Sequence, residues 1–206
     1  MTTSVNNAVK SNTKIYMSWP EFNKKLEELG YSEKEREFVS RAFVFASKAH
    51  EGQTRASGEP YVTHTIAVAL ESANLKLDAV TIAASLLHDT IEDCGVTREE
   101  IAKNFGEDTA FLVESTSKLG SVRYNEAQRK VESLRKMFLA FAKDIRVVLI
   151  KLLDRLHNMR TIQFVRPEKQ KRIAQETLEI YAPIAYRLGM GSVKGELEDL
   201  SFPIVH

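Results

Sequence analysis

Cysteine is nearly absent from this sequence of 206 residues, which contains only Cys94. A single cysteine cannot form an intramolecular disulfide, and it excludes a zinc site made of several cysteines. Such a chain is typical of a reducing compartment, so we expect a cytoplasmic protein. Glycine and proline are also scarce, at 9 and 5 residues, which predicts few turns and long elements of secondary structure.

Neither sign of charge is in excess. Lysine and arginine total 29 and aspartate and glutamate total 28, which gives a formal net charge of +1. This balance argues against a protein that coats nucleic acid or an anionic membrane surface. It leaves room for a local basic pocket that binds a small phosphate ligand. We therefore expect no nucleic-acid partner.

Long apolar runs are also missing. The longest stretch without a charged residue is 60–70, about half of the ~20 apolar residues that a membrane span needs. Residues 1–14 are rich in serine, threonine and asparagine and have no apolar core of the kind found in secretory signals. We expect residues 1–16 to form a mobile tail and the chain to have no contact with a membrane.

Capping patterns mark the starts of five helices. Three are capping boxes, in which a serine or threonine is followed three residues later by glutamate. Two are aspartates that directly precede an apolar run. These signals lie at residues 18–21, 32–35, 78, 97–100 and 144.

The remaining signals also favour helices. Residues 51–61 hold two glycines and a proline, which predicts a loop before helical patterning resumes. Residues 168–188 are predicted to be helical, with a kink at Pro183. No alternating segments are joined by an Asn-Gly or Asp-Gly turn, so no hairpin is expected. The predicted fold class is all-α.

One histidine and three carboxylates crowd together directly after the apolar run 83–87. On one continuous helix, His88 and Glu92 form an i,i+4 pair, and so do Asp89 and Asp93. Carboxylates repel at this spacing, so the group costs stability unless a cation neutralises it. Imidazole and carboxylate ligands suit Mn²⁺, Fe²⁺ or Zn²⁺. A solvated helix end is the alternative interpretation of the acidic pair.

A second polar group continues an apolar helix. Asp154, Asn158 and Thr161 fall at i, i+4 and i+7, so they share one face behind the apolar run 147–153. Buried polar groups need partners, because leaving them unpaired is costly. These residues therefore either face a ligand or form an internal polar network between helices.

The loop before residue 61 supplies a third group. Gly58 permits close approach of the backbone to a ligand, and Arg55 offers a planar fork suited to phosphate. His64 follows shortly after this loop. Taken alone, His64 is also compatible with a buried structural histidine.

Together and in this order, the three groups resemble a known family. The motifs SGEPYVTH (57–64), LLHDTIED (86–93) and KLLDRLHNMRT (151–161) look like the hydrolase domain of the Rel/Spo alarmone family. That domain belongs to the HD superfamily of metal-dependent phosphohydrolases. The resemblance runs from about residue 46 to residue 202. It implies a helical bundle of HD type with a metal site between helices.

The resemblance also implies an activity and a role for each matching residue. The expected reaction removes pyrophosphate from the 3′ position of ppGpp or pppGpp and returns GDP or GTP. One Mn²⁺ would be bound by His64, His88, Asp89 and Asp154. The matching acidic pair beside the metal-bound water is Glu92 and Asp93, and spacing does not decide which is the base. The residues that match the family's substrate contacts are Arg55, Ser57, Asn158 and Thr161. Further candidates for phosphate contact are Lys118, Arg155 and Arg160, each of which could equally form a structural ion pair.

The resemblance divides the chain as a tail at 1–16, a hydrolase domain at 17–202 and a short end at 203–206, with no synthetase domain expected within it. A synthetase domain is expected as a partner only in a longer parent chain. Two other functions stay open: an HD phosphohydrolase acting on another nucleotide, and a regulatory module that binds the alarmone without hydrolysing it.

Overall fold

The computed structural model of the chain describes residues 17–120, 135, 137–140 and 142–206. The tail expected at residues 1–16 lies outside the described residues. Within them the fold is all-α, as expected, with no strand and a single isolated bridge between Thr54 and Pro60. No helix formed by these residues combines the length and the apolar character that a membrane crossing requires.

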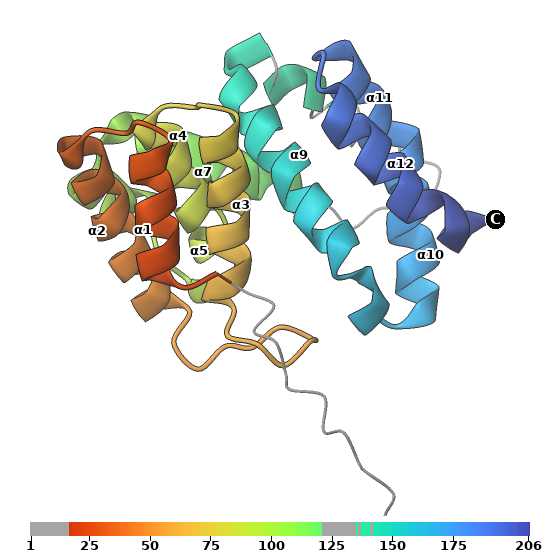
Figure 1. Cartoon of the computed structure of the whole chain (residues 1–206), viewed down its shortest axis with the longest axis horizontal. Helices are drawn as coiled ribbons and strands as arrows, with labels where there is room; N and C mark the ends of the chain where they lie inside the picture. The colour runs from red at the N-terminus through yellow and green to blue at the C-terminus, as the bar shows by residue number, and fades with distance from the viewer. Residues whose placement is uncertain (1–16, 121–134, 136, 141) are drawn as a thin grey trace, which may run out of the picture.

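Figure 1 shows the helices in chain order, with a long loop between α2 and α3. Their bounds are α1 Trp19–Glu28, α2 Glu33–Ala49, α3 Val62–Asn74, α4 Ala79–Leu87, α5 Thr90–Cys94, α6 Arg98–Phe105, α7 Glu107–Gly120, α9 Ile145–Arg160, the 3₁₀ turn η1 Ile162–Phe164, α10 Pro167–Glu176, the π-helical turn η2 Thr177–Tyr181, α11 Ala182–Arg187 and α12 Gly191–Val205.

The expected caps are present. Ser18 and Ser32 each form a complete capping box at the starts of α1 and α2. Thr97 accepts a hydrogen bond from the backbone N–H of Glu100 at the start of α6. The aspartates at positions 78 and 144 accept from backbone N–H groups of the first turns of α4 and α9. These bonds satisfy N–H groups that have no partner inside the helix, which is why the caps locate helix starts.

Two stretches differ from the sequence-based expectation. The helix that carries the acidic pair is broken, because α4 ends at Leu87 and α5 begins only at Thr90, with His88 and Asp89 in a turn between them. The sequence predicts one helix with a kink at Pro183. The structure has the π-helical turn η2 directly before the short helix α11 that contains Pro183. Proline lacks an N–H and its ring crowds the carbonyl of the preceding turn, and a wider turn accommodates both effects.

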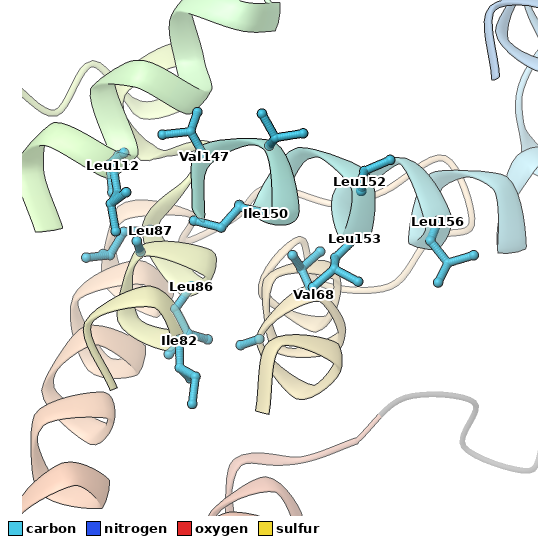
Figure 2. Close-up of a cluster of buried hydrophobic side chains, with 14 of the residues drawn as sticks. Val68, Ile82, Leu86, Leu87, Leu112, Val147, Ile150, Leu152, Leu153 and Leu156 are labelled. Atoms are coloured by element: carbon cyan, nitrogen blue, oxygen red, sulfur yellow. The ribbon is translucent and has the colours of Figure 1, made fainter. Parts of the chain in front are cut away.

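Helix α9 lies between two groups of helices, with α1 to α7 on one side and α10 to α12 on the other (Figure 1). Its apolar face packs into the core, where Ile150 and Leu153 lie close to side chains of α4 and α3 (Figure 2). Helix α4 is itself surrounded, since every residue from Thr81 to Leu87 is buried. A helix enclosed in this way places the residues that follow it, His88 and Asp89, in the interior.

Candidate metal centre

Three buried side chains from different helices converge on one point. His64 comes from α3, His88 directly follows α4, and Asp154 comes from α9. Each offers one ligand atom, and these atoms all lie within 4.8 Å of one another. Asp154 Oδ1 is 3.3 Å from His64 Nε2 and 3.8 Å from His88 Nε2. The sequence separates these residues widely, and the packing of α9 against α3 and α4 brings them together.

Asp89 completes the group. Its Oδ2 lies 3.0 Å from His88 Nε2 and 3.6 Å from His64 Nε2. The structure therefore places two imidazole nitrogens and two carboxylates around one centre. All four residues are those that the resemblance implied as metal ligands, and their ligand role stays a prediction.

The two histidine rings are held by their other nitrogens. His88 Nδ1 donates to the backbone carbonyl oxygen of Ser85 at 2.8 Å, and His64 Nδ1 lies 2.8 Å from Nδ1 of His157. These contacts turn both Nε2 atoms toward the carboxylates. Metal-binding histidines are commonly oriented in this way, because the bond at one ring nitrogen fixes the other as the ligand atom.

A divalent cation fits this donor set. His88 Nε2 is buried and has no hydrogen-bond partner, although Asp89 Oδ2 is only 3.0 Å away without the alignment that a hydrogen bond needs. A buried polar atom without a partner is costly. A cation bound between the carboxylates would take up the lone pair of this nitrogen and offset the two negative charges.

The charges in the centre shift its pKa values in opposite directions. Burial alone lowers the pKa of His88, but the negative charges of Asp89 and Asp154 outweigh burial and raise it to about 9. For His64 burial dominates and lowers the pKa. Burial raises the pKa of Asp154, yet the charge of the nearby Lys151 outweighs it and holds the pKa below its usual range. Asp154 is therefore ionised, as a ligand must be.

The acidic pair lies on the short helix α5 beside the centre. Tyr61 donates from its hydroxyl to Asp89 Oδ2 at 2.8 Å, and the same hydroxyl lies 3.1 Å from Asp93 Oδ2. For Glu92, burial is the main influence and raises the pKa of its carboxyl group. The break before α5 thus directs Glu92 and Asp93 into the same pocket as the ligand cluster.

That pocket has a volume of about 390 Å³ and combines acidic and basic walls. Arg55 Nη2 donates to Asn158 Oδ1 at 2.9 Å and to Thr161 Oγ1 at 3.1 Å. Asn158 in turn donates to Asp154 Oδ1 at 2.6 Å. Lys151 Nζ lies 2.9 Å from Asp154 Oδ2. One chain of contacts therefore joins the loop at Arg55 to the ligand cluster.

The other residues expected to contact substrate lie elsewhere. Ser57 and Thr161 line a neighbouring cavity of about 670 Å³, which Arg160 also lines. Arg160 pairs with Glu71 on α3 and with Glu196 on α12, and neither it nor Lys118 is among the residues lining the pocket of the ligand cluster. The binding roles of Ser57, Lys118 and Arg160 stay predictions.

The sequence-based reasoning missed three residues that the structure brings to this region. Tyr61 and Lys151 line the pocket beside Arg155, which the sequence had offered as a phosphate candidate, and His157 contacts His64. A signal existed for Lys151, since Lys151, Asp154 and Asn158 share one helix face by their spacing. Spacing gives no signal for the contact of His157 with His64, which spans 93 residues.

The HD domain family matches residues 42–191, a range that contains all four members of the ligand cluster. This chain belongs to the HD domain family. Membership implies a divalent metal ion, and the donor set described above fits one.

Curated relatives and one solved structure are similar to this chain over most of its length. The chain is 50% identical over 176 residues to a guanosine-3′,5′-bis(diphosphate) 3′-pyrophosphohydrolase of Vibrio cholerae, covering 85% of this chain and 25% of the relative. It is 50% identical over 169 residues to the bifunctional (p)ppGpp synthase/hydrolase SpoT of Escherichia coli K12, covering 82% and 24%. The chain thus spans about a quarter of the length of these relatives.

The solved structure is described as a metazoan ortholog of SpoT that hydrolyzes ppGpp and plays a role in starvation responses. It matches this HD domain with a TM-score of 0.57 and 26% identity, covering 83% of this chain and 87% of that one. This match extends over nearly the whole of the solved chain, in contrast to the long bacterial relatives.

Proposed function

We propose that this HD domain hydrolyses the 3′-pyrophosphate group of ppGpp and pppGpp, giving GDP or GTP and pyrophosphate, with Mn²⁺ as its cofactor. The observation that carries the proposal is the cluster of two histidines and two carboxylates facing a pocket whose wall includes Arg55. The names of the relatives, which specify ppGpp 3′-pyrophosphohydrolases, support the choice of substrate.

The ligand cluster would hold the metal through His64, His88, Asp89 and Asp154. A divalent ion held there would supply a water of lowered pKa and would neutralise charge on a phosphoryl oxygen. Imidazole and carboxylate ligands suit Mn²⁺, Fe²⁺ or Zn²⁺, and the choice of Mn²⁺ among them rests on the resemblance to the Rel/Spo family.

Glu92 takes the proton of the attacking water. Its carboxylate lines the pocket, and burial raises its pKa toward the range in which a carboxylate is an effective base. Asp93 is held beside Tyr61 and orients the water. The water oxygen forms a bond to the phosphorus attached at the 3′ position and the bond from that phosphorus to O3′ breaks. The proton that Glu92 took from the water passes to O3′, which leaves as a hydroxyl group.

Arg55 binds the phosphate groups of the substrate. Its guanidinium is fixed by Asn158 and Thr161, so its planar donors are preorganised rather than free in solvent. Arginine forms strong charge-assisted bonds with phosphate oxygens. Asn158 on α9 would contact the nucleotide, and Thr161, directly after the end of α9, would reach it from the neighbouring cavity together with Ser57. Lys118 and Arg160 are outer candidates.

The substrate is a small molecule, and we propose that the domain acts in the cytoplasm. We also propose that it can work beside a synthetase domain in a longer parent chain. The name of the Escherichia coli relative, which joins synthase to hydrolase, supports this partner, because the chain covers only 24% of that protein.

A substrate panel tests the proposed function. The purified chain with Mn²⁺ is incubated separately with ppGpp, pppGpp, GTP and deoxynucleoside triphosphates, and products are separated by ion-exchange chromatography. Release of pyrophosphate with GDP from ppGpp, and little release from the triphosphates, is expected. Preferred cleavage of another nucleotide would favour a different HD phosphohydrolase, and tight binding of ppGpp without turnover would favour a regulatory module.

A further inference from the structure

The two histidines of the ligand cluster are held by different kinds of group. His88 Nδ1 bonds to a backbone carbonyl, that of Ser85, which no side-chain substitution at residue 85 removes. His64 Nδ1 instead faces the side chain of His157, with 2.8 Å between the two Nδ1 atoms. The orientation of His64 therefore depends on one replaceable side chain.

Counting protons assigns the direction of this bond. Two ring nitrogens 2.8 Å apart share one proton, so one ring donates and the other accepts. When His64 Nε2 binds a metal it must offer its lone pair, which leaves the proton of the neutral ring on Nδ1. His157 Nδ1 is then the acceptor, and the proton of its own ring is on Nε2.

The surroundings hold His157 in this position. It lies on α9 one turn after Asp154, so the same rigid helix supplies a ligand and the partner of a second ligand. The rings of His64 and His157 are 4.8 Å apart and tilted by 48°, while Tyr61 packs edge-on against His64 at 5.7 Å. His64 is thus confined between α9 and the loop that precedes α3.

We propose that His157 is a positioning residue that selects the tautomer and ring orientation in which His64 binds the metal. The proposal rests on the metal role of His64 in the proposed function, but not on the identity of the substrate. It adds a residue that never touches the substrate yet sets the strength of the metal site. Partners of this kind commonly change metal affinity by about 10- to 100-fold.

Two substitutions separate positioning from packing. His157→Leu fills the space without an acceptor, whereas His157→Asn places a carbonyl oxygen near the position of Nδ1. Equilibrium dialysis with Mn²⁺ alone measures affinity, and thermal unfolding of the metal-free proteins measures the structural cost. We expect about 10- to 100-fold weaker Mn²⁺ binding for His157→Leu and recovery toward the unchanged chain for His157→Asn.

A matched control uses a buried polar side chain away from the ligand cluster. Thr109, on α7, donates from its hydroxyl to the backbone carbonyl oxygen of Phe105 at 3.0 Å. Thr109→Val should change thermal stability while keeping Mn²⁺ affinity. Equal Mn²⁺ affinity in His157→Leu, His157→Asn and the unchanged chain would overturn the proposal.

A spectroscopic measurement tests the tautomer directly. With Zn²⁺ as a diamagnetic substitute, proton–nitrogen correlation spectra of the ¹⁵N-labelled full chain should show a hydrogen-bonded Nδ1–H on His64. A proton on Nε2 of metal-loaded His64 would refute the assignment. Neither the dialysis nor the spectra use ppGpp. If both give the results expected for His157 but the chain does not hydrolyse ppGpp, the proposed function is refuted and the role of His157 is kept.

Discussion

Arg55, in the loop before α3, donates to the side-chain oxygen of Asn158 on α9 over 2.9 Å and across 103 residues of sequence. Asn158 also donates to Asp154, so the proposed phosphate-binding arginine and a proposed metal ligand share one neighbour. The proposed substrate contact and the proposed metal ligand are thereby joined through a single amide. This contact connects the loop before α3 to α9 at the pocket.

Removing Arg55 should weaken substrate binding more than metal binding. Arg55→Ala deletes the charged donors that face the pocket, and charge-assisted bonds of this kind contribute about 1.5–3 kcal/mol. We expect the KM for ppGpp to rise about 10- to 100-fold. Steady-state kinetics and Mn²⁺ dialysis measure the two effects separately. Arg98→Ala, on α6 and paired with Glu107, is the matched control and should leave KM unchanged; an unchanged KM in Arg55→Ala would contradict the assignment.

Glu92→Gln should slow hydrolysis while leaving the metal bound. The amide keeps the size of the side chain but cannot accept the proton of water, so turnover should fall by about 10²- to 10⁴-fold. Mn²⁺ content should stay that of the unchanged chain, since Glu92 lies outside the ligand cluster. Asp93→Asn tests the alternative choice of base. A larger loss of turnover in Asp93→Asn than in Glu92→Gln would reverse the roles.

Metal affinity should rise with pH. The carboxylates raise the pKa of His88 to about 9 in the metal-free chain, so below that pH the ring carries a proton that a metal must displace. Each unit of pH below 9 should then weaken apparent Mn²⁺ affinity by about tenfold, until other groups also take up protons. Dialysis at a series of pH values measures the slope. An affinity independent of pH throughout this range would show that His88 is already neutral.

Arg160 is expected to contribute mainly to stability. It joins α9 to Glu71 on α3 and to Glu196 on α12 through short ion pairs. Its side chain is partly exposed, so solvent screens these bonds, and Arg160→Ala should lower the free energy of unfolding by about 1–2 kcal/mol. Urea unfolding measures this change. Unaltered stability together with weaker ppGpp binding would instead support the phosphate-contact role predicted from the sequence.

Local chemistry made the helix starts predictable. Each helix cap bonds to a group two or three residues further along the chain, so the sequence contains the whole interaction. The capping residues are Ser18, Ser32, Thr97 and the two aspartates. The motifs that resemble the Rel/Spo family likewise picked out four residues that the structure brings to one centre. Their spacing alone did not show that they meet, because α3, α4 and α9 approach only after packing.

Other features depend on contacts that a sequence does not display. The break between α4 and α5 comes directly before Glu92 and Asp93, which line the pocket. The sequence does not display this break, because the helical pattern continues across it without a glycine or proline. The pairing of His64 with His157 and the anchoring of Asp93 by Tyr61 both join residues distant in the chain. The sequence left open whether Arg160 contacts phosphate or forms a structural ion pair, and in the structure its guanidinium pairs with Glu71 and Glu196.

The central claim is that the ligand cluster holds the metal that makes this chain a ppGpp hydrolase. The most direct measurement compares pyrophosphate release from ppGpp by the unchanged chain and by Asp154→Asn, each with and without Mn²⁺, alongside its Mn²⁺ content. The account predicts pyrophosphate and GDP only from the unchanged chain with Mn²⁺, and loss of both metal and turnover in Asp154→Asn. Full turnover by Asp154→Asn, or no pyrophosphate from the metal-loaded unchanged chain, would contradict it.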